Sequence, residues 1–363
     1  MADRRPERLE ALRRKLREAQ LDAFVVASPA NLRYLTGFSG SSGMALITEG
    51  SVTFLSDFRY RTQAADEIGD LARVLIEGGG LWERLSRQLT DQRAVRAVGY
   101  EAHLITAHEA QRLADPARPW TFQGVSDLVE GLRAVKSPEE VEAIRAAGTA
   151  ATGALAETIR QVRAGQTEYE VAGLLEGALR RHGSEWYAFP TIVASGPRSA
   201  LPHARTSERV VAPGDYLLLD FGAVVQGYCS DVTRTFVVGA APTARQGEIH
   251  ALVLAAHQAA IKGLRAGLTG RQGDALAREV IEAGGHGEAF GHSLGHGVGL
   301  EVHEAPRLAR TTEERLGEAA VVTVEPGIYL EGWGGVRIED DVVLRATGAE
   351  LLTEFDRELV RLG

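Results

Sequence analysis

The chain of 363 residues has a single cysteine, Cys229, and no apolar run near the ~20 residues that a membrane-spanning helix needs. A lone cysteine excludes an intramolecular disulfide and is typical of proteins in a reducing cytoplasm. The first residues lack the apolar core of a secretory signal peptide. We therefore expect a cytoplasmic protein without a membrane-spanning segment.

The chain also lacks a basic excess, because 40 lysines and arginines stand against 49 aspartates and glutamates, for a formal net charge of −9. Without a surplus of positive charge to neutralise phosphates, no nucleic-acid partner is expected. The glycine run at 78–80 is not followed by the Gly-Lys-Ser/Thr of a phosphate-binding loop. The remaining composition, 44% hydrophobic and 25% charged, is that of an ordinary globular protein long enough for two domains.

Two apolar runs, Tyr216–Phe221 and Val232–Val238, predict two β-strands joined by a turn. Each run has an aspartate within or beside it, Asp220 and Asp231. A turn centred at 225–226 would place the aspartates directly opposite one another, and a slip of one residue would make them diagonal neighbours on one face. Carboxylates that close repel, and one protonates unless a cation lies between them. The pair therefore predicts a metal site. The alternative is two solvated carboxylates on an outer sheet face, but the apolar residues beside them predict a mostly buried sheet.

A helix start divides the chain into two parts. Ser137 suits the N-cap, with proline after it and Glu140 three residues on. Upstream, helix and strand patterns alternate as in a small α/β domain without a catalytic cluster, and we place the boundary between residues 126 and 127. Downstream, the pattern Arg-Ala-Gly-x-Thr between two helices occurs twice, at 163–167 and 265–269. This repeat suggests two related α+β halves about a pseudo-twofold axis, with a site where the halves meet.

The second half carries most of the remaining chemistry. Three of the ten histidines fall within twelve residues, among glycines that let backbone approach a ligand: His292, His296 and His303. Glu325 ends an apolar strand, and Glu339 lies within a β-pattern. A glutamate buried in a strand needs a partner, whereas an edge strand that exposes Glu339 and Asp341 would not require one.

Four of these carboxylates and one imidazole would together carry a charge of about −4, which two divalent cations neutralise. Oxygen-rich ligation favours Mn²⁺, with Co²⁺, Fe²⁺ or Zn²⁺ as alternatives. Two metal ions about 3.5 Å apart can bind and deprotonate one bridging water. The set therefore predicts metal-assisted hydrolysis.

The order of these residues resembles that of the "pita-bread" metallopeptidases, which include methionine aminopeptidase, aminopeptidase P and prolidase. The matching motifs are LLLDFGA, SDVTRTF, GHGVGLEVHE, VEPGIY and GVRIEDD. Upstream, LDAFVVASPANLRYLTGFSGSSG resembles the creatinase-type N-terminal domain of the proline-directed branch. The resemblance implies an α+β pita-bread domain with pseudo-twofold halves at residues 127–363, after a smaller α/β N-terminal domain at residues 1–126.

The resemblance also implies two metal ions per subunit and a role for each ligand. Asp220 would chelate one ion, and His296 with Glu325 the other. Asp231 and Glu339 would bridge both ions. The bridging hydroxide would attack the scissile carbonyl, and Glu325 would shuttle the proton as general base and acid.

Four further residues match positions around the substrate in this family. His303 would steady the scissile carbonyl and the tetrahedral intermediate, and His203 would bind on the substrate side. His292 would line the pocket for the proline ring. Arg337 would pair with the metal carboxylates, and its charge would hold Glu339 ionised.

The implied substrate is a small proline-containing peptide, whose tertiary amide lacks the N–H that ordinary peptidases recognise. We favour prolidase, an Xaa-Pro dipeptidase, because the modest length and the wording GHGVGLEVHEAP are nearer to that group. Aminopeptidase P, which removes the N-terminal residue of longer Xaa-Pro peptides, is the alternative. Creatinases and non-catalytic binding proteins share the fold, but the intact ligand set argues against both. The family also implies a homodimer.

Overall fold

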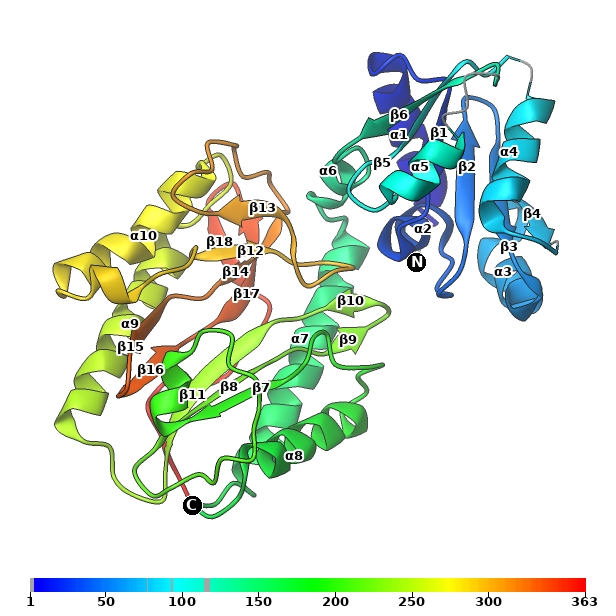
Figure 1. Ribbon diagram of the computed structural model, residues 1–363. Coiled ribbons are helices and arrows are strands. Elements are labelled where there is room, and N and C mark those ends of the chain that lie inside the picture. Colours follow the sequence, from blue (N-terminus) through cyan, green and yellow to red (C-terminus); the bar gives the residue numbers. More distant parts are fainter. Residues whose placement is uncertain (1–2, 77, 93, 114–117) are drawn as a thin grey trace. The chain divides into compact units, whose positions relative to one another are not determined.

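A computed structural model describes residues 3–76, 78–92, 94–113 and 118–363. The chain divides into two compact units, Met1–Arg133 and Ala134–Gly363 (Figure 1). The first unit thus extends beyond the boundary that we place at residue 126. It does so because Arg133 Nη1 donates a 2.7 Å hydrogen bond to Asn31 Oδ1, and Asn31 Nδ2 donates one of 2.5 Å to Glu130 Oε1. No helix in the described ranges is long and apolar enough to cross a membrane.

The first unit is a mixed β-sheet with helices, as the alternating pattern predicts. Its strands are β1 (Ala23–Val26), β2 (Met44–Thr48), β3 (Val52–Ser56), β4 (Arg73–Ile76), β5 (Ala97–Glu101) and β6 (Thr121–Val125). They lie in the order β4-β3-β2-β1-β5-β6. Its helices are α1 (Arg5–Glu18), α2 (Pro29–Thr36), α3 (Arg61–Ile68), α4 (Leu81–Asp91), α5 (Ala107–Leu113) and α6 (Glu130–Arg133). Leu9, Leu12 and Leu16 recur at helical spacing and are all buried on α1.

The second unit contains two halves of similar construction. The first half has α7 (Pro138–Ile159) and α8 (Glu168–Arg181), and its sheet has the order β19-β11-β8-β7. The strands are β7 (Ile192–Ser195), β8 (Tyr216–Phe221), β11 (Val232–Val238) and β19 (Arg361–Leu362), with a separate pair of β9 (Val224–Val225) and β10 (Tyr228–Cys229).

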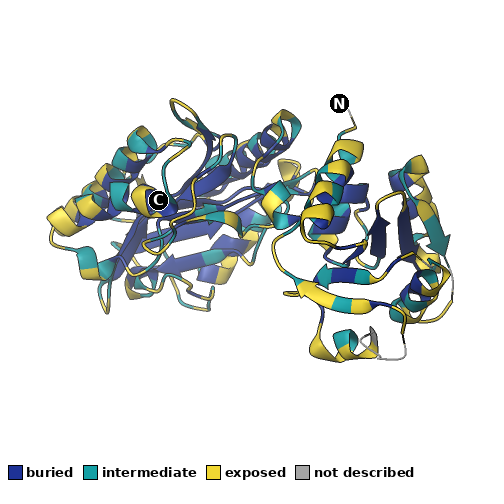
Figure 2. Ribbon diagram, turned by 90° about the horizontal axis from the view of Figure 1, so that it is seen from above, coloured by how far each residue is buried: buried dark blue, intermediate teal, exposed yellow. Residues whose placement is uncertain are grey.

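The second half has α9 (Ala244–Gly263) and α10 (Gly270–Ala283), and its sheet has the order β13-β12-β14-β17-β18. Its strands are β12 (Gly295–Gly297), β13 (Glu304–Leu308), β14 (Val321–Val324), β17 (Asp340–Arg345) and β18 (Gly348–Leu351), with a separate pair of β15 (Gly327–Leu330) and β16 (Gly334–Arg337). In Figure 1, α7 and α8 flank the sheets on one side and α9 and α10 on the other. Figure 2 shows that the strands between the helix pairs are mostly buried, while the outer helix faces are exposed.

The repeat predicted from the sequence corresponds to the two helix pairs. The helices have 22 and 14 residues in the first half and 20 and 14 in the second. Each of the four helices begins with a capping box. The hydroxyl of the N-cap residue accepts a hydrogen bond from the backbone N–H three residues later, and the side chain of that later residue accepts one from the N-cap N–H. The N-caps are Ser137, Thr167, Thr243 and Thr269. These reciprocal hydrogen bonds explain why the same local sequence starts a helix in both halves.

The strands β8 and β11 have the predicted bounds, and their turn settles the register. Tyr228 pairs with Val225, so the turn consists of Gln226 and Gly227, which have φ of 51° and 75°. In the β8–β11 pairing, Asp220 lies opposite Thr233. Asp231, two residues before Thr233, is therefore a diagonal neighbour of Asp220, which confirms the second of the two expected arrangements.

A buried ion cluster joins the two halves. Arg234 Nη2 on β11 donates to Asp340 Oδ1 on β17 at 2.8 Å, and Arg357 Nε donates to Asp340 Oδ2 at 2.6 Å. His257 Nε2 of α9 lies 3.0 Å from Asp340 Oδ2. Burial alone would raise the pKa of Asp340, but Arg234 and His257 outweigh it and lower the pKa below its usual range. The cluster is thus a charge-paired core at the junction of two hydrophobic cores.

Replacing Arg234 by methionine is expected to lower the free energy of unfolding by about 3–5 kcal/mol, because it removes one partner of a buried ion pair. Urea unfolding followed by circular dichroism measures this. Arg345→Met serves as the matched control, since Arg345 pairs with Glu350 at an exposed position, and a change within about 0.5 kcal/mol is expected there. An equal fall in the free energy of unfolding in both variants would contradict the idea that the buried ion pair matters more to stability than the exposed one.

Candidate metal centre

The predicted ligands come from both halves and meet between the two sheets. Asp220 lies on β8 and Asp231 just before β11, in the first half. His296 lies on β12, Glu325 directly after β14 and Glu339 directly before β17, in the second half. An isolated bridge between Thr233 and Glu339 links the sheets, and the Glu339 N–H donates to Thr233 O at 3.1 Å.

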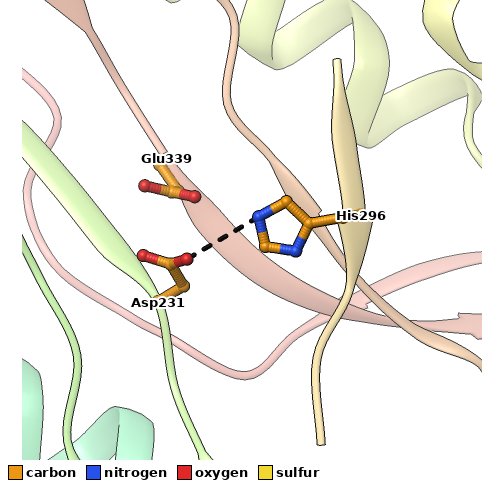
Figure 3. Close-up of side chains that lie close together, drawn as sticks. All are labelled: Asp231, His296 and Glu339. Atoms are coloured by element: carbon orange, nitrogen blue, oxygen red, sulfur yellow. Dashed lines mark ion pairs between the residues drawn. The ribbon is translucent and has the colours of Figure 1, made fainter. Parts of the chain in front are cut away.

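Asp231, His296 and Glu339 form the tightest group (Figure 3). One possible ligand atom of each lies within 4.8 Å of the others. His296 Nδ1 lies 3.1 Å from Gly297 O, which places the proton on Nδ1 and the lone pair on Nε2. This Nε2 lies 3.8 Å from Asp231 Oδ2. Burial lowers the pKa of His296 to about 4, so the imidazole is neutral at pH 7, as a metal ligand must be.

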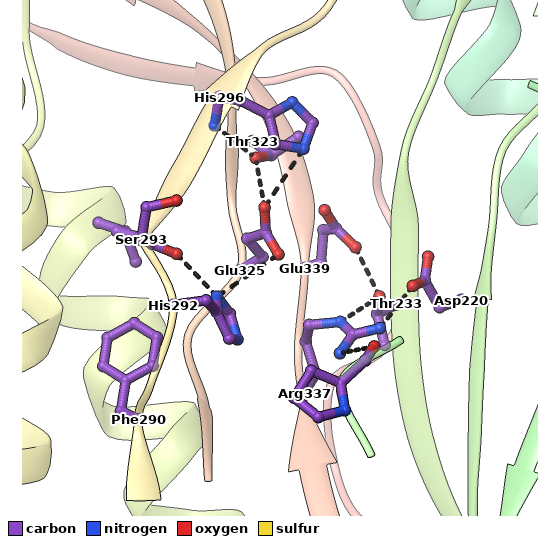
Figure 4. A network of polar contacts seen from close by, with 12 residues as sticks. Asp220, Thr233, Phe290, His292, Ser293, His296, Thr323, Glu325, Arg337 and Glu339 are labelled. Atoms are coloured by element: carbon purple, nitrogen blue, oxygen red, sulfur yellow. Dashed lines mark hydrogen bonds and ion pairs between the residues drawn. The ribbon is translucent and has the colours of Figure 1, made fainter. Parts of the chain in front are cut away.

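Glu325 faces the same space (Figure 4). Its Oε1 lies 3.3 Å from His296 Nε2 and accepts a 3.2 Å hydrogen bond from Thr323 Oγ1. Thr323 Oγ1 in turn accepts from the His296 N–H at 3.1 Å. One threonine therefore fixes the relative position of both side chains.

Asp220 lies beside Arg337 rather than at the centre of the group. Arg337 Nη2 donates to Asp220 Oδ2, and Arg337 Nε donates to Thr233 Oγ1 at 3.1 Å. Thr233 Oγ1 donates to Glu339 Oε2 at 2.5 Å, so Arg337 reaches Glu339 through a hydroxyl (Figure 4). Arg337 lies within the buried part of the site and carries its positive charge there.

Burial and mutual repulsion raise the pKa values of the carboxyl groups. Burial is the larger cause for Asp231 and Glu339, followed by the neighbouring carboxylates, and both pKa values lie well above their usual range. Burial also raises the pKa of Glu325 to about 8. Arg337 lowers the pKa of Glu339, as expected, but burial and the charge of Glu325 raise it by more when no cation is bound.

The donor set fits a divalent cation. Among the described residues, Asp231 Oδ1 and Asp341 Oδ1 are buried without a hydrogen-bond partner. Buried carboxylate oxygens are seldom left unpaired. Several such oxygens and one neutral imidazole nitrogen around one space are ligands that divalent metal ions accept.

The three other predicted histidines lie around this group. The ring of His303 is exposed, and its centroid lies 4.3 Å from that of His296. His292 Nδ1 lies 2.8 Å from Ser293 O and 3.9 Å from Glu325 Oε2. His203 is exposed and follows Pro202, whose carbonyl oxygen accepts a 3.2 Å hydrogen bond from Arg337 Nη1. After burial, the charge of His203 is the next cause that lowers the pKa of His303.

Sequence reasoning missed Tyr329 as a member of the site. Arg337 Nη1 donates to Tyr329 Oη at 2.7 Å, and Tyr329 Oη lies 2.9 Å from His292 Nε2. Because Nδ1 of His292 donates to Ser293 O, the tyrosine hydroxyl donates to Nε2. The motif VEPGIY contains Tyr329, but nothing local in that motif indicates these two partners.

Asp341 is also part of the site, and the edge-strand alternative is wrong. The strand β17 lies between β14 and β18, and Glu339 and Asp341 are 2% and 0% exposed. Asp341 Oδ2 accepts a 2.9 Å hydrogen bond from the Asp231 N–H. Burial raises the pKa of Asp341 as well. The alternation Glu339-Asp340-Asp341 could have indicated that Asp341 lies on the same face as Glu339, because residues two apart share one face of a strand.

Metal binding is expected to release protons at pH 7. Glu325 has a pKa raised to about 8, so it holds a proton that a divalent cation displaces. Calorimetric titration of EDTA-treated protein with Mn²⁺, in buffers of different ionisation enthalpy, should give a release of about one proton or more. Glu325→Gln should reduce the release, whereas Glu331→Gln, at an exposed glutamate, should not. A binding heat that is independent of the buffer would contradict the raised pKa values.

Comparison with known proteins agrees with this geometry. Residues 142–346 match the model of metallopeptidase family M24, and residues 8–135 match that of the creatinase/prolidase N-terminal domain. The chain is 38% identical over 355 residues to an Xaa-Pro dipeptidase of Pyrococcus furiosus, across 98% of this chain and 99% of that protein. The structure of an Xaa-Pro dipeptidase from Bacillus anthracis has a TM-score of 0.95 at 39% identity and covers 99% and 100% of the two chains. The structure of an X-Pro aminopeptidase from Thermotoga maritima has a TM-score of 0.91 at 40% sequence identity, and the match covers 98% of this chain and 99% of that one. The chain, a creatinase-type N-terminal domain followed by a pita-bread domain, therefore belongs to metallopeptidase family M24.

Proposed function

We propose that this metallopeptidase is an Xaa-Pro dipeptidase, or prolidase, which hydrolyses the peptide bond before proline. The observation that carries the proposal is the convergence of the buried Asp231 and Glu339 with the half-buried His296. It occurs in a chain that resembles an Xaa-Pro dipeptidase of Pyrococcus furiosus over its full length.

Two divalent ions, with Mn²⁺ favoured, would be held by five side chains: Asp220, Asp231, His296, Glu325 and Glu339. The unpaired oxygen of Asp231 and the excess of carboxylate over imidazole ligands support this set. When bound, the ions supply a hydrolytic nucleophile at neutral pH and polarise the scissile carbonyl. The number of carboxyl groups whose pKa burial raises supports more than one cation, because a single ion leaves net negative charge in a dry space.

The chain's own residues would hold the substrate and move the proton. Glu325, whose Oε1 lies 3.3 Å from His296 Nε2, would take up and release the proton as general base and acid. His303 and His203 are exposed beside the site, where they can donate to a substrate carbonyl. Arg337 holds Asp220 and Tyr329 in place through its guanidinium group.

His292 would take part through its ring rather than its nitrogens. Both nitrogens already have partners, Ser293 O and Tyr329 Oη. The ring lies edge-on against Phe290, with centroids 5.1 Å apart. Two adjoining ring surfaces of this kind suit the apolar body of a proline residue, which supports the proline pocket implied by the family resemblance.

Aminopeptidase P activity is the second candidate, because the chain is 40% identical to the X-Pro aminopeptidase of Thermotoga maritima. The two activities differ in what lies beyond proline: a dipeptidase binds a free carboxylate there, and an aminopeptidase leaves room for more chain. A homodimer in the cytoplasm completes the proposal. It rests on the family resemblance and on the single cysteine.

Hydrolysis of Ala-Pro and of Ala-Pro-Ala, with Mn²⁺ and with EDTA, tests the proposal. We expect Mn²⁺-dependent cleavage of the dipeptide and little cleavage of the tripeptide, since a dipeptidase closes its site around the terminal carboxylate. Preferred cleavage of the tripeptide would move the protein to the aminopeptidase group. Cleavage of neither peptide by metal-loaded protein would overturn the Xaa-Pro peptidase proposal.

Replacing Glu325 by glutamine is expected to lower kcat by about 10²–10⁴-fold, because an amide cannot take up the proton that a general base accepts. Initial rates on the preferred peptide at saturating Mn²⁺ measure the effect. The control Glu331→Gln changes an exposed glutamate and should keep the wild-type kcat. A comparable loss in both variants, or no loss in Glu325→Gln, argues against the assigned role.

A further inference from the structure

A buried ion pair on α10 lies outside the ligand set. Arg278 Nε lies 2.5 Å from Asp274 Oδ2, and Arg278 Nη2 donates to Asp274 Oδ1 at 2.8 Å. The two residues are one helical turn apart, and their side chains are 7% and 1% exposed. Buried ion pairs are weak contributors to stability, because desolvation offsets the attraction between the charges. The pair therefore needs a reason other than stability alone.

The pair's other contacts go to one stretch of backbone, residues 290–294. Arg278 Nη1 donates to Phe290 O at 2.9 Å, and Nη2 donates to His292 O at 2.7 Å. The Leu294 N–H donates to Asp274 Oδ1 at 3.0 Å. This stretch lies just before β12 and belongs to no helix or strand. The ion pair thus supplies partners for three backbone groups, Phe290 O, His292 O and the Leu294 N–H, that a regular element would otherwise pair.

The held stretch reaches the site at two points. It carries His292, whose Nδ1 lies 3.9 Å from Glu325 Oε2. The Glu325 N–H donates to Leu294 O at 2.9 Å. Asp274 and Glu325 are therefore linked through the N–H and the carbonyl of one residue, Leu294. Figure 4 shows the Phe290–Ser293 stretch beside Glu325.

We propose that Asp274 and Arg278 are positioning residues of the peptidase site. They fix the backbone of 290–294 and thereby the places of the His292 ring and of Glu325, without contacting the substrate. Only a planar guanidinium bound to a carboxylate offers donors in fixed directions to two carbonyls at once. A lysine at 278 keeps the charge but loses this geometry. The inference rests on the proposed function, since the roles of His292 and Glu325 come from it.

Arg278→Lys tests the proposal while it preserves the charge. A small misplacement of reacting groups can lower kcat by about 10²-fold, and we expect a loss of that order on the peptide that the wild-type protein prefers. The affinity for Mn²⁺, measured by calorimetry, should weaken by up to about 10–100-fold, because Glu325 is one of the proposed ligands, so kcat is compared at saturating Mn²⁺. The matched control is Arg271→Lys on the same helix, because Arg271 pairs with Glu313 at an exposed position, and it should keep the wild-type kcat.

A double-mutant cycle with His292→Ala separates positioning from general stability. If Arg278 acts through the held stretch, Arg278→Lys should lower kcat less in the His292→Ala background than in the wild-type background, since only the route through Leu294 and Glu325 then remains. The same fold-loss in both backgrounds, or a loss that only follows the folded fraction, would overturn the proposal.

Hydrogen exchange keeps the test independent of the activity. In Arg278→Lys and in Asp274→Asn, the amides of residues 290–297 should exchange faster than in the wild-type protein, while those of α7 should not. Unchanged exchange in 290–297 overturns the inference even if the enzyme cleaves Xaa-Pro peptides. Faster exchange in a protein that cleaves neither Ala-Pro nor Ala-Pro-Ala supports the placement and refutes only the proposed function.

Discussion

Like charges gathered in a dry space are the constraint on which the rest of the second unit depends. After burial, the charges of Glu339 and Glu325 in one half raise the pKa of Asp231 in the other, and the charge of Glu325 raises the pKa of Glu339. Protonation relieves the repulsion, and so does a bound cation, but only a cation also attracts both halves at once. A metal ion bound there therefore stabilises the native arrangement by a free energy that rises with the logarithm of its affinity, because the ligands are assembled only when the halves are together.

The carboxylates are held in place by contacts between two strands, β11 and β17, whose successive side chains point to opposite faces. Along β11, Thr233 contacts Glu339 and the next residue, Arg234, contacts Asp340. Along β17, Glu339 and Asp341 face the metal centre while Asp340 faces the ion cluster. One face of these two strands therefore presents carboxylates to the candidate metal centre, and the other face pairs its carboxylate with arginine. The ion cluster fixes the relative position of the strands, and this position brings Asp231 and Glu339 together.

Much of this arrangement is visible in the sequence, because it depends on local signals. The capping residues predict the starts of α7 and α8, and the two apolar runs predict β8 and β11 with their bounds. The contacts of Asp274 and Arg278 with residues 290–294 and the role of Tyr329 could not be derived in this way, because they depend on how separate segments pack together. The doubt over Glu339 has the same origin, since a strand pattern does not show whether a strand is central or at an edge. Pairing with β14 and β18 decides that question, and it is a property of the whole sheet.

The alternation along β17 also limits how the length of the chain can change during evolution. A single residue inserted between Ile338 and Asp340 would move every later side chain of the strand to the opposite face. The ion cluster would then lose Asp340, and the metal centre would receive it in place of Asp341. Insertions and deletions in this unit are therefore better tolerated in connections such as the exposed residues 241–242 between β11 and α9, where no residue of either charged group lies.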